Sequence, residues 1–365
     1  MITTTIFPGR YIQGYEAIKR LKKLIPKYGT RGFIILSPSS YETILPEIRE
    51  SLGESTEIVA EKFGRECSDE EINRLSDSAT AGGCDVIIGI GGGKTLDTAK
   101  AVAHGMQKPV FIVPTIASTD APCSALSVIY RPNGQIKRFL VYPKNPDVVL
   151  VDTKIIAKTP VRLLVSGMGD ALATWFEAES CMIKYARNMT GSCGSMTAYA
   201  LAQLCYETLL EHGMAAKLAC EAGIVIPALE HVVEANTLLS GVGFESGGVA
   251  AAHAIHDGLN GLEATHEYFH GEKVAFGTLT SLFLTDKPSE TIDEVYSFCE
   301  SVGLPTTLSE LGLEDASPED LRKVAKIACS EKESIHNEPM PITEESVFAA
   351  IIAADREGTR RKIVR

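Results

Sequence analysis

The segment between residues 85 and 104, DVIIGIGGGKTLDTAKAVAH, constrains the fold of this chain more than any other. Residues 85–90 are almost continuously apolar and β-branched, which is typical of a strand buried on both faces. Glycines follow, and residues 96–104 have the pattern of a helix. The segment therefore predicts a buried strand, a glycine turn and a helix in direct succession.

The same alternation of strand and helix recurs around this segment. Short apolar runs at residues 33–36 and 110–113 predict further buried strands, and a helix is expected from Glu70 with Ser68 as its N-cap. Two later runs, at residues 137–141 and 148–151, suggest additional strands. Repeated βαβ units predict a parallel sheet with helices on its faces.

The pattern changes after about Thr159, where Ala/Leu/Glu-rich helical patterns replace the β-branched runs. Helices are predicted over residues 171–185, 196–211, 215–235 and 318–329, the last with Ser317 as N-cap. The chain has 365 residues, more than the roughly 250–300 that one core usually holds. We therefore predict an α/β domain over residues 1–160 and an all-helical domain over residues 161–365.

Charge and cysteine usage exclude several classes of protein. The net charge of −12 argues against nucleic acid or an anionic membrane as the main partner. No apolar run reaches the ~18 residues of a membrane span, and the start MITTTIFPGR does not read as a secretory signal. Nine scattered cysteines without a CxxC pair argue against a disulfide framework. These features predict a globular cytoplasmic protein.

The glycine turn is a candidate site for phosphate groups. Gly91, Gly92 and Gly93 can take positive φ angles, and the following helix directs free N–H groups at the turn. Lys94 adds positive charge. Neither GxGxxG nor the Walker pattern fits, because Lys94 and Ile88 stand where glycines are required. Pyrophosphate binding is the hypothesis, and a purely structural strand-to-helix turn stays open as the alternative.

Four of the eight histidines lie between residues 253 and 270, at His253, His256, His266 and His270. His253 and His256 are three residues apart on a predicted helix, and His270 lies beyond a loop. Imidazoles combined with a carboxylate such as Asp170 form a zinc-type ligand set. Spacing does not select Asp170 over other acidic residues as the ligand. Two structural alternatives stay open: Asp170 could cap its helix, and His253 could be a hydrogen-bonded core residue.

Five motifs carry a family resemblance. They are GIGGGKTLDTAK, PTIASTDAPCSALSVIY, GMGDALATWFEA, GVGFESGGVAAAHAIHDG and YFHGEKVAFGTL. In these motifs the chain resembles the bacterial glycerol dehydrogenases of the iron-containing, group III alcohol dehydrogenase superfamily over nearly its full length. The resemblance implies a Rossmann-like NAD-binding domain followed by an all-helical metal-binding domain, an architecture like that of dehydroquinate synthase.

The resemblance also implies zinc-dependent oxidation of glycerol to dihydroxyacetone, with NAD as hydride acceptor. Carried over by position, the metal ligands are Asp170, His253 and His270, and these with Asp120 form the catalytic and glycerol-binding set. The implied cofactor contacts are Gly92, Gly93, Lys94, Asp97, Thr115, Ser118, Ser124, Leu126 and Tyr130. Thr174 stands where iron-using relatives have a fourth ligand, which leaves zinc an open coordination position.

Several points stay open at this stage. Ser37 stands where the family usually has a ribose-binding Asp, so NAD is expected but strict exclusion of NADP is in doubt. Anionic substrates such as glycerol 1-phosphate are an alternative that Lys273 keeps open, and a catalytically dead NAD-binding scaffold is another. The proton acceptor is either His256 or a water chain. Relatives are homo-oligomers, often octamers, which is analogy alone.

Overall fold

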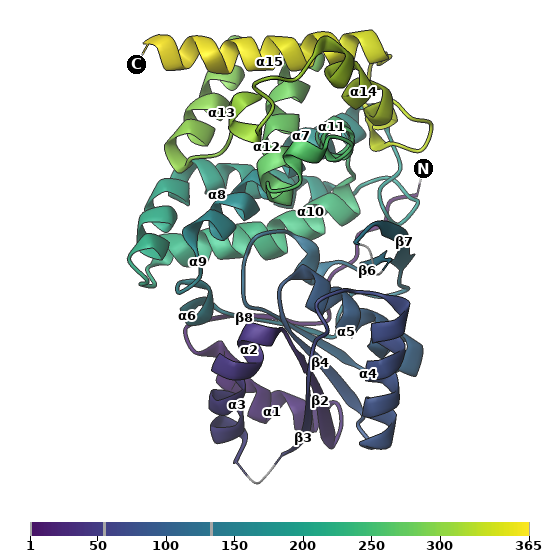
Figure 1. Cartoon of the computed structure of the whole chain (residues 1–365). Helices are drawn as coiled ribbons and strands as arrows, with labels where there is room; N and C mark the ends of the chain where they lie inside the picture. The colour runs from purple at the N-terminus through teal and green to yellow at the C-terminus, as the bar shows by residue number, and fades with distance from the viewer. Residues whose placement is uncertain (1, 54–55, 132–133, 365) are drawn as a thin grey trace.

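The computed structural model describes residues 2–53, 56–131 and 134–364. Its centre is a six-stranded parallel sheet in the order β1-β8-β5-β4-β2-β3. The strands are β1 (Tyr11–Gly14), β2 (Arg31–Leu36), β3 (Glu57–Lys62), β4 (Val86–Gly91), β5 (Val110–Pro114) and β8 (Val148–Asp152). Figure 1 shows this sheet in one half of the molecule and the helices of the second half packed above it. The predicted parallel sheet is confirmed.

Both faces of the sheet are buried, which explains the continuous apolar runs in its sequence. Phe33 and Ile35 face a core shared with α4 (Asp69–Ala81) and α5 (Gly93–Met106), whereas Ile34 and Leu36 face a second core. That second core lies under η1 (Ala17–Arg20), α1 (Leu21–Leu24), η2 (Ile25–Lys27), α2 (Pro38–Thr43) and α3 (Leu45–Leu52). Ser68 caps α4 as predicted, because its Oγ accepts from the N–H of Glu71.

One predicted strand lies outside this sheet. The run at residues 137–141 forms β7 (Ile136–Val141), which pairs antiparallel with β6 (Leu126–Tyr130) in a two-stranded hairpin. The connection between them is too short for the crossover that a parallel pair requires. Hydrogen bonds from Val128 and Ser127 to Asp97 fix the hairpin against α5.

The second half of the chain is helical. Its α-helices are α6 (Thr153–Ile156), α7 (Val161–Lys184), α8 (Met196–Glu221), α9 (Pro227–Glu234), α10 (Ser240–Gly247), α11 (Ala251–Asn260), α12 (His270–Leu284), α13 (Ser289–Val302), α14 (Pro318–Ala328) and α15 (Glu344–Val364). A π-helical turn, η5 (Ala235–Leu239), joins α9 to α10. In the described residues no strand longer than an isolated bridge follows β8. The domain boundary after residue 160 stays a prediction.

The single helix predicted over residues 215–235 is wrong, and so is the break predicted before it, because α8 runs without interruption from Met196 to Glu221. The chain ends α8 at Glu221, and Gly223 then takes a φ of 66°, in the left-handed region that favours glycine. Pro227 begins α9, where its missing N–H is tolerated. The prediction for α14 is confirmed, because Ser317 and Asp320 form a reciprocal capping box at its start.

The nine cysteines are all free thiols, and seven of them are buried. This agrees with the expectation of no disulfide framework. In the described part of the chain, no helix combines the length and apolarity needed to cross a bilayer.

Candidate active site

Three side chains from three helices converge at one point. Asp170 lies in the middle of α7, His253 near the start of α11, and His270 at the first position of α12. Asp170 Oδ1 lies 2.9 Å from His270 Nε2 and 3.5 Å from His253 Nε2. The three ligand atoms all lie within 4.8 Å of one another. Since Asp170 is in a helix interior, the alternative that it merely caps its helix is wrong.

The hydrogen bonds behind the two imidazoles orient them for metal binding. His253 Nδ1 donates to Glu177 Oε2 at 2.6 Å, and His270 Nδ1 lies 3.0 Å from His256 Nε2. With Nδ1 bound to these partners in both rings, each Nε2 faces Asp170, where it can bind a metal once it is deprotonated. These partners explain why both rings face the carboxylate with the same nitrogen.

The resulting donor set fits a divalent cation. Asp170 Oδ1 is buried, and among the described residues no hydrogen bond of normal geometry reaches it. Three ligand atoms this close need positive charge between them, which a proton on an imidazole or a bound divalent cation can supply. One carboxylate oxygen and two imidazole nitrogens are ligands that zinc accepts readily. The triad therefore has the chemistry of a metal site with room for a further ligand.

The electrostatics of Asp170 agree with this. Burial opposes its ionisation, but the neighbouring His270 and His253 outweigh burial and hold the pKa of the Asp170 carboxyl well below its ordinary value. Glu177 and Asp170 likewise outweigh burial at His253 and raise the pKa of its imidazole. Asp170 is thus ionised and able to bind a cation.

Glycines explain how α7 and α12 approach closely enough for Asp170 and His270 to meet. Gly169 precedes Asp170 and lies against the carbonyl oxygen of Gly271, which follows His270. A Cβ at Gly271 would overlap the carbonyl oxygen of Ser166. Side chains at these positions would push the two helices apart, so glycine is required for contact between backbones.

This packing predicts that Gly271→Ala destabilises the protein by about 3 kcal/mol or more, because backbone atoms cannot yield to the added methyl. Gly105→Ala is the matched control: this exposed glycine near the end of α5 has open space around its would-be Cβ. It should be neutral or stabilise by about 0.5–1 kcal/mol. Urea denaturation followed by circular dichroism measures both, and equal stabilities of the two variants would refute the packing argument.

Asp120 lies directly beside the triad. Its backbone N–H donates to Asp170 Oδ2 at 3.1 Å, and its Oδ2 accepts from the Ser240 hydroxyl at 2.9 Å. The loop that carries it is fixed to α7, because the Asn236 amide donates to the carbonyls of Ala117 and Leu164. Burial and the charge of Asp170 raise the pKa of the Asp120 carboxyl well above its ordinary value.

The glycine turn lies at the carboxyl ends of the central strands. Ser37 follows β2 and donates its N–H to the carbonyl of Ile90 in β4, and the N–H of Thr115 after β5 donates to the carbonyl of Gly91. β2 and β4 flank the point where the strand order reverses, which is where doubly wound sheets bind dinucleotides. Of the three glycines only Gly91 has a positive φ, of 159°.

In the described part of the chain, no side chain caps the N-terminus of α5 at this turn. Gly92 is the N-cap and provides no side-chain cap, and a Cβ at Gly93 would meet nothing within 4 Å. Lys94 pairs with Glu66 at 2.8 Å and lies 4.5 Å above the ring of Tyr130. The backbone N–H groups of the first helical turn are thus accessible to a phosphate.

The remaining predicted cofactor residues divide into two groups. Ser118 belongs to the loop after β5, and Leu126 and Tyr130 share the half-buried face of β6. Asp97 and Ser124 are buried, where Asp97 Oδ2 accepts from the N–H of Val128 and the Ser124 hydroxyl donates to Ala121. Their direct contact with a cofactor stays a prediction.

Known proteins with similar sequences and structures identify the family of this chain. The model of the family "Iron-containing alcohol dehydrogenase" matches residues 8–153. A curated glycerol dehydrogenase from Thermotoga maritima is 65% identical over 99% of both chains. The chain belongs to the glycerol dehydrogenase family. Solved structures agree: the glycerol dehydrogenase of Schizosaccharomyces pombe has a TM-score of 0.93 at 39% identity, covering 98% of this chain and 92% of that one. The structure of a probable glycerol dehydrogenase from Sinorhizobium meliloti has a TM-score of 0.91 at 43% identity, and the match covers 98% of this chain and 100% of that one.

In this member of the glycerol dehydrogenase family, Thr174 is buried and its hydroxyl is 2.8 Å from that of Ser240. It therefore supports the hydroxyl that binds Asp120 and is no part of the triad. His266 is exposed and bonds to the carbonyl of Asn260, apart from the triad. Glu177 was not among the predicted site residues, although its position seven residues after Asp170 places both on one face of α7.

Proposed function

We propose that this protein oxidises glycerol to dihydroxyacetone, with zinc bound by Asp170, His253 and His270 and with NAD as hydride acceptor. The observation that carries the proposal is the convergence of these three side chains beside Asp120. The relatives named glycerol dehydrogenase support the substrate. Zinc bound there would act as a Lewis acid that makes an alcohol hydroxyl more acidic.

The protein's own residues hold and orient the reactants. Glu177 and His256 fix the two imidazoles, so the ligand atoms keep their places before metal arrives. The Asp120 carboxyl accepts a hydrogen bond from a second hydroxyl of glycerol, which orients the carbon that loses hydride. Such positioning can account for a large part of the rate of an enzyme.

The cofactor would lie along the carboxyl ends of β2, β4 and β5. The N–H groups of Gly93 and Lys94 would receive the pyrophosphate. Ser37 would face the adenosine ribose; its hydroxyl lies 2.7 Å from that of Ser40. NAD supplies the hydride-accepting nicotinamide. A hydroxyl neither repels a 2′-phosphate nor binds the ribose diol as a carboxylate does, so we expect NAD to be preferred over NADP by a modest factor.

A neutral substrate fits the surroundings of the triad better than an anionic one. Lys273, the cation that left anionic substrates open, is buried and its Nζ donates to Asn260 Oδ1 and to the carbonyl of Thr265. Arg162 forms a bidentate pair with Glu272. Lys273 and Arg162 are therefore already bound to groups of the protein and are not free to bind a substrate phosphate. This favours glycerol over glycerol 1-phosphate.

Steady-state kinetics before and after chelation test this function. We expect turnover of glycerol with NAD, loss of at least about 99% of it after chelation, and recovery on adding zinc. Glycerol 1-phosphate and NADP are the comparison substrate and cofactor. Full activity of a protein shown by elemental analysis to be free of metal would refute the metal assignment, and preference for glycerol 1-phosphate would refute the substrate.

A further inference from the structure

A cluster of positive charge lies at the first strand, although the chain as a whole is acidic. Between residues 10 and 27 there are six Lys and Arg residues and one Glu, in a protein of net charge −12. This segment contains β1 and the continuous helical stretch formed by η1, α1 and η2. Such a local reversal of charge has no part in the proposed reaction.

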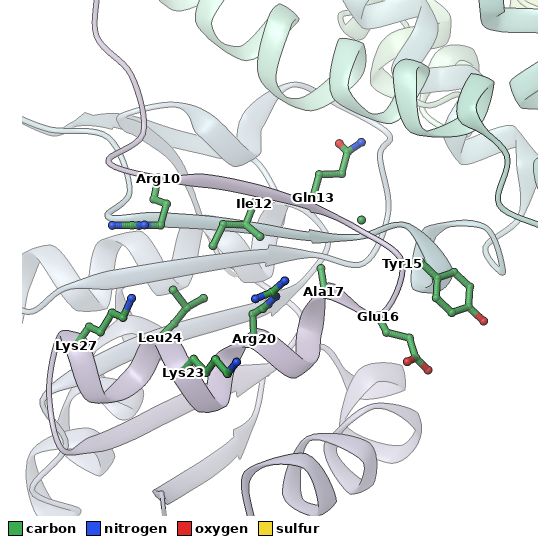
Figure 2. A pocket seen from close by; sticks show the side chains of 11 residues that line it. Arg10, Ile12, Gln13, Tyr15, Glu16, Ala17, Arg20, Lys23, Leu24 and Lys27 are labelled. Atoms are coloured by element: carbon green, nitrogen blue, oxygen red, sulfur yellow. The ribbon is translucent and has the colours of Figure 1, made fainter.

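Four of these cations line one cavity. Arg20, Lys23 and Lys27 are spaced three and four residues apart, so they share one face of the helical stretch. Arg10 reaches toward them from the chain just before β1, as Figure 2 shows. The cavity has a volume of about 400 Å³, within the range of about 300–1,000 Å³ that is usual for small-molecule sites.

The four cations have no carboxylate partner in the part of the chain that the structure describes. Among the described residues, no Asp or Glu oxygen lies within 4.0 Å of the charged groups of Arg10, Arg20, Lys23 or Lys27. Glu16, the acid that also lines the cavity, is bound by Lys154 at 2.7 Å and by Lys19. Those two lysines lower its pKa to about 2. The positive charge facing the cavity is therefore uncompensated.

The base of the cavity is apolar. Ile12, Ala17 and Leu24 line it, and Ala17 and Leu24 are buried. The cavity is separate from the glycine turn, because β8 and β5 lie between β1 and β4, a distance of about 14 Å at the usual strand spacing. It combines cationic walls, which suit phosphate oxygens, with a floor that suits an apolar group.

We propose that this cavity binds a small molecule carrying two or more phosphate groups, at a site separate from the triad and the glycine turn. Two neighbouring lysines provide a matched test. Lys23 lines the cavity, whereas Lys22 is also exposed but does not line it. Lys23→Gln and Lys22→Gln remove the same charge from adjacent positions of the same helical turn.

Titration calorimetry on the full-length protein, with inorganic tripolyphosphate as the probe, measures the binding. We expect saturable binding that weakens about tenfold in Lys23→Gln, less than twofold in Lys22→Gln, and steeply with added salt. ADP is then added as competitor. Displacement by ADP supports a nucleotide ligand, and failure of ADP to displace the probe supports an inorganic polyphosphate.

Two results would overturn the proposal. Absence of saturable binding, or equal weakening in both variants, would show that only diffuse surface charge attracts the probe. A change of sedimentation coefficient in Lys23→Gln without tripolyphosphate binding would assign the cavity to contact with the acidic surface of another copy of the chain. Neither result bears on the catalytic proposal, because the cavity shares no residue with the triad or the glycine turn.

Discussion

His270→Ala is expected to abolish metal retention and to lower turnover of glycerol by about a thousandfold or more. The substitution removes one of the three ligand atoms, and the Lewis acid is worth several kcal/mol of transition-state stabilisation. Binding of NAD should change little, since His270 lies on α12 and the glycine turn lies between β4 and α5. Elemental analysis of the purified variant and NAD titration by fluorescence measure the two effects.

His266→Ala is the matched control for this experiment. His266 lies four residues before His270 but is exposed and bonds to a backbone carbonyl outside the triad. Its removal should leave both metal content and turnover within about twofold of the parent, as surface changes usually do. If His270→Ala retained metal and full activity, the ligand assignment would be wrong.

Asp120→Asn is expected to alter which alcohols the enzyme prefers. Loss of the carboxyl should lower kcat/KM for glycerol by about a hundredfold, because an amide that turns its NH2 group toward the substrate leaves a buried hydroxyl without an acceptor, which costs about 1–3 kcal/mol. For 2-propanol, which has no second hydroxyl, the fall should be less than about tenfold. The Asp120 backbone N–H, which donates to Asp170, is retained in the variant.

Measuring two alcohols separates loss of the hydroxyl contact from general damage to the triad. A variant that merely disturbs the triad loses activity toward both substrates alike. Equal losses with glycerol and 2-propanol would therefore contradict the role of Asp120 as a hydroxyl-binding residue. Unchanged metal content in the variant would confirm that Asp170 is undisturbed.

Local patterns predicted most of the sheet correctly. The β-branched runs that became β2, β4, β5 and β8 are buried on both faces, so their sequences alone separate them from the solvent-exposed segments. The partner of β7 was not predictable in the same way. Its alternation of exposed and half-buried residues fits any edge strand, and pairing depends on contacts made after the chain folds.

The metal site was only partly accessible from spacing. His253 falls on a predicted helix, but spacing could not show that Asp170 meets it and His270 from a helix more than eighty residues earlier. The family resemblance selected Asp170, and the structure confirms the convergence of the three side chains. Glu177 was missed because a glutamate on a helix is usually solvated, and its burial became visible only in the folded chain.

The contact between Gly169 and Gly271 has a thermodynamic consequence. Since two backbones touch there, the gap between the ligand on α7 and the ligand on α12 cannot widen unless the helices themselves part. A metal ion bound by ligands on both helices binds the folded chain and not the unfolded one. Its binding free energy therefore adds to the free energy of unfolding and raises the melting temperature. Depleting the cell of this metal should then shorten the lifetime of the protein as well as abolish its activity.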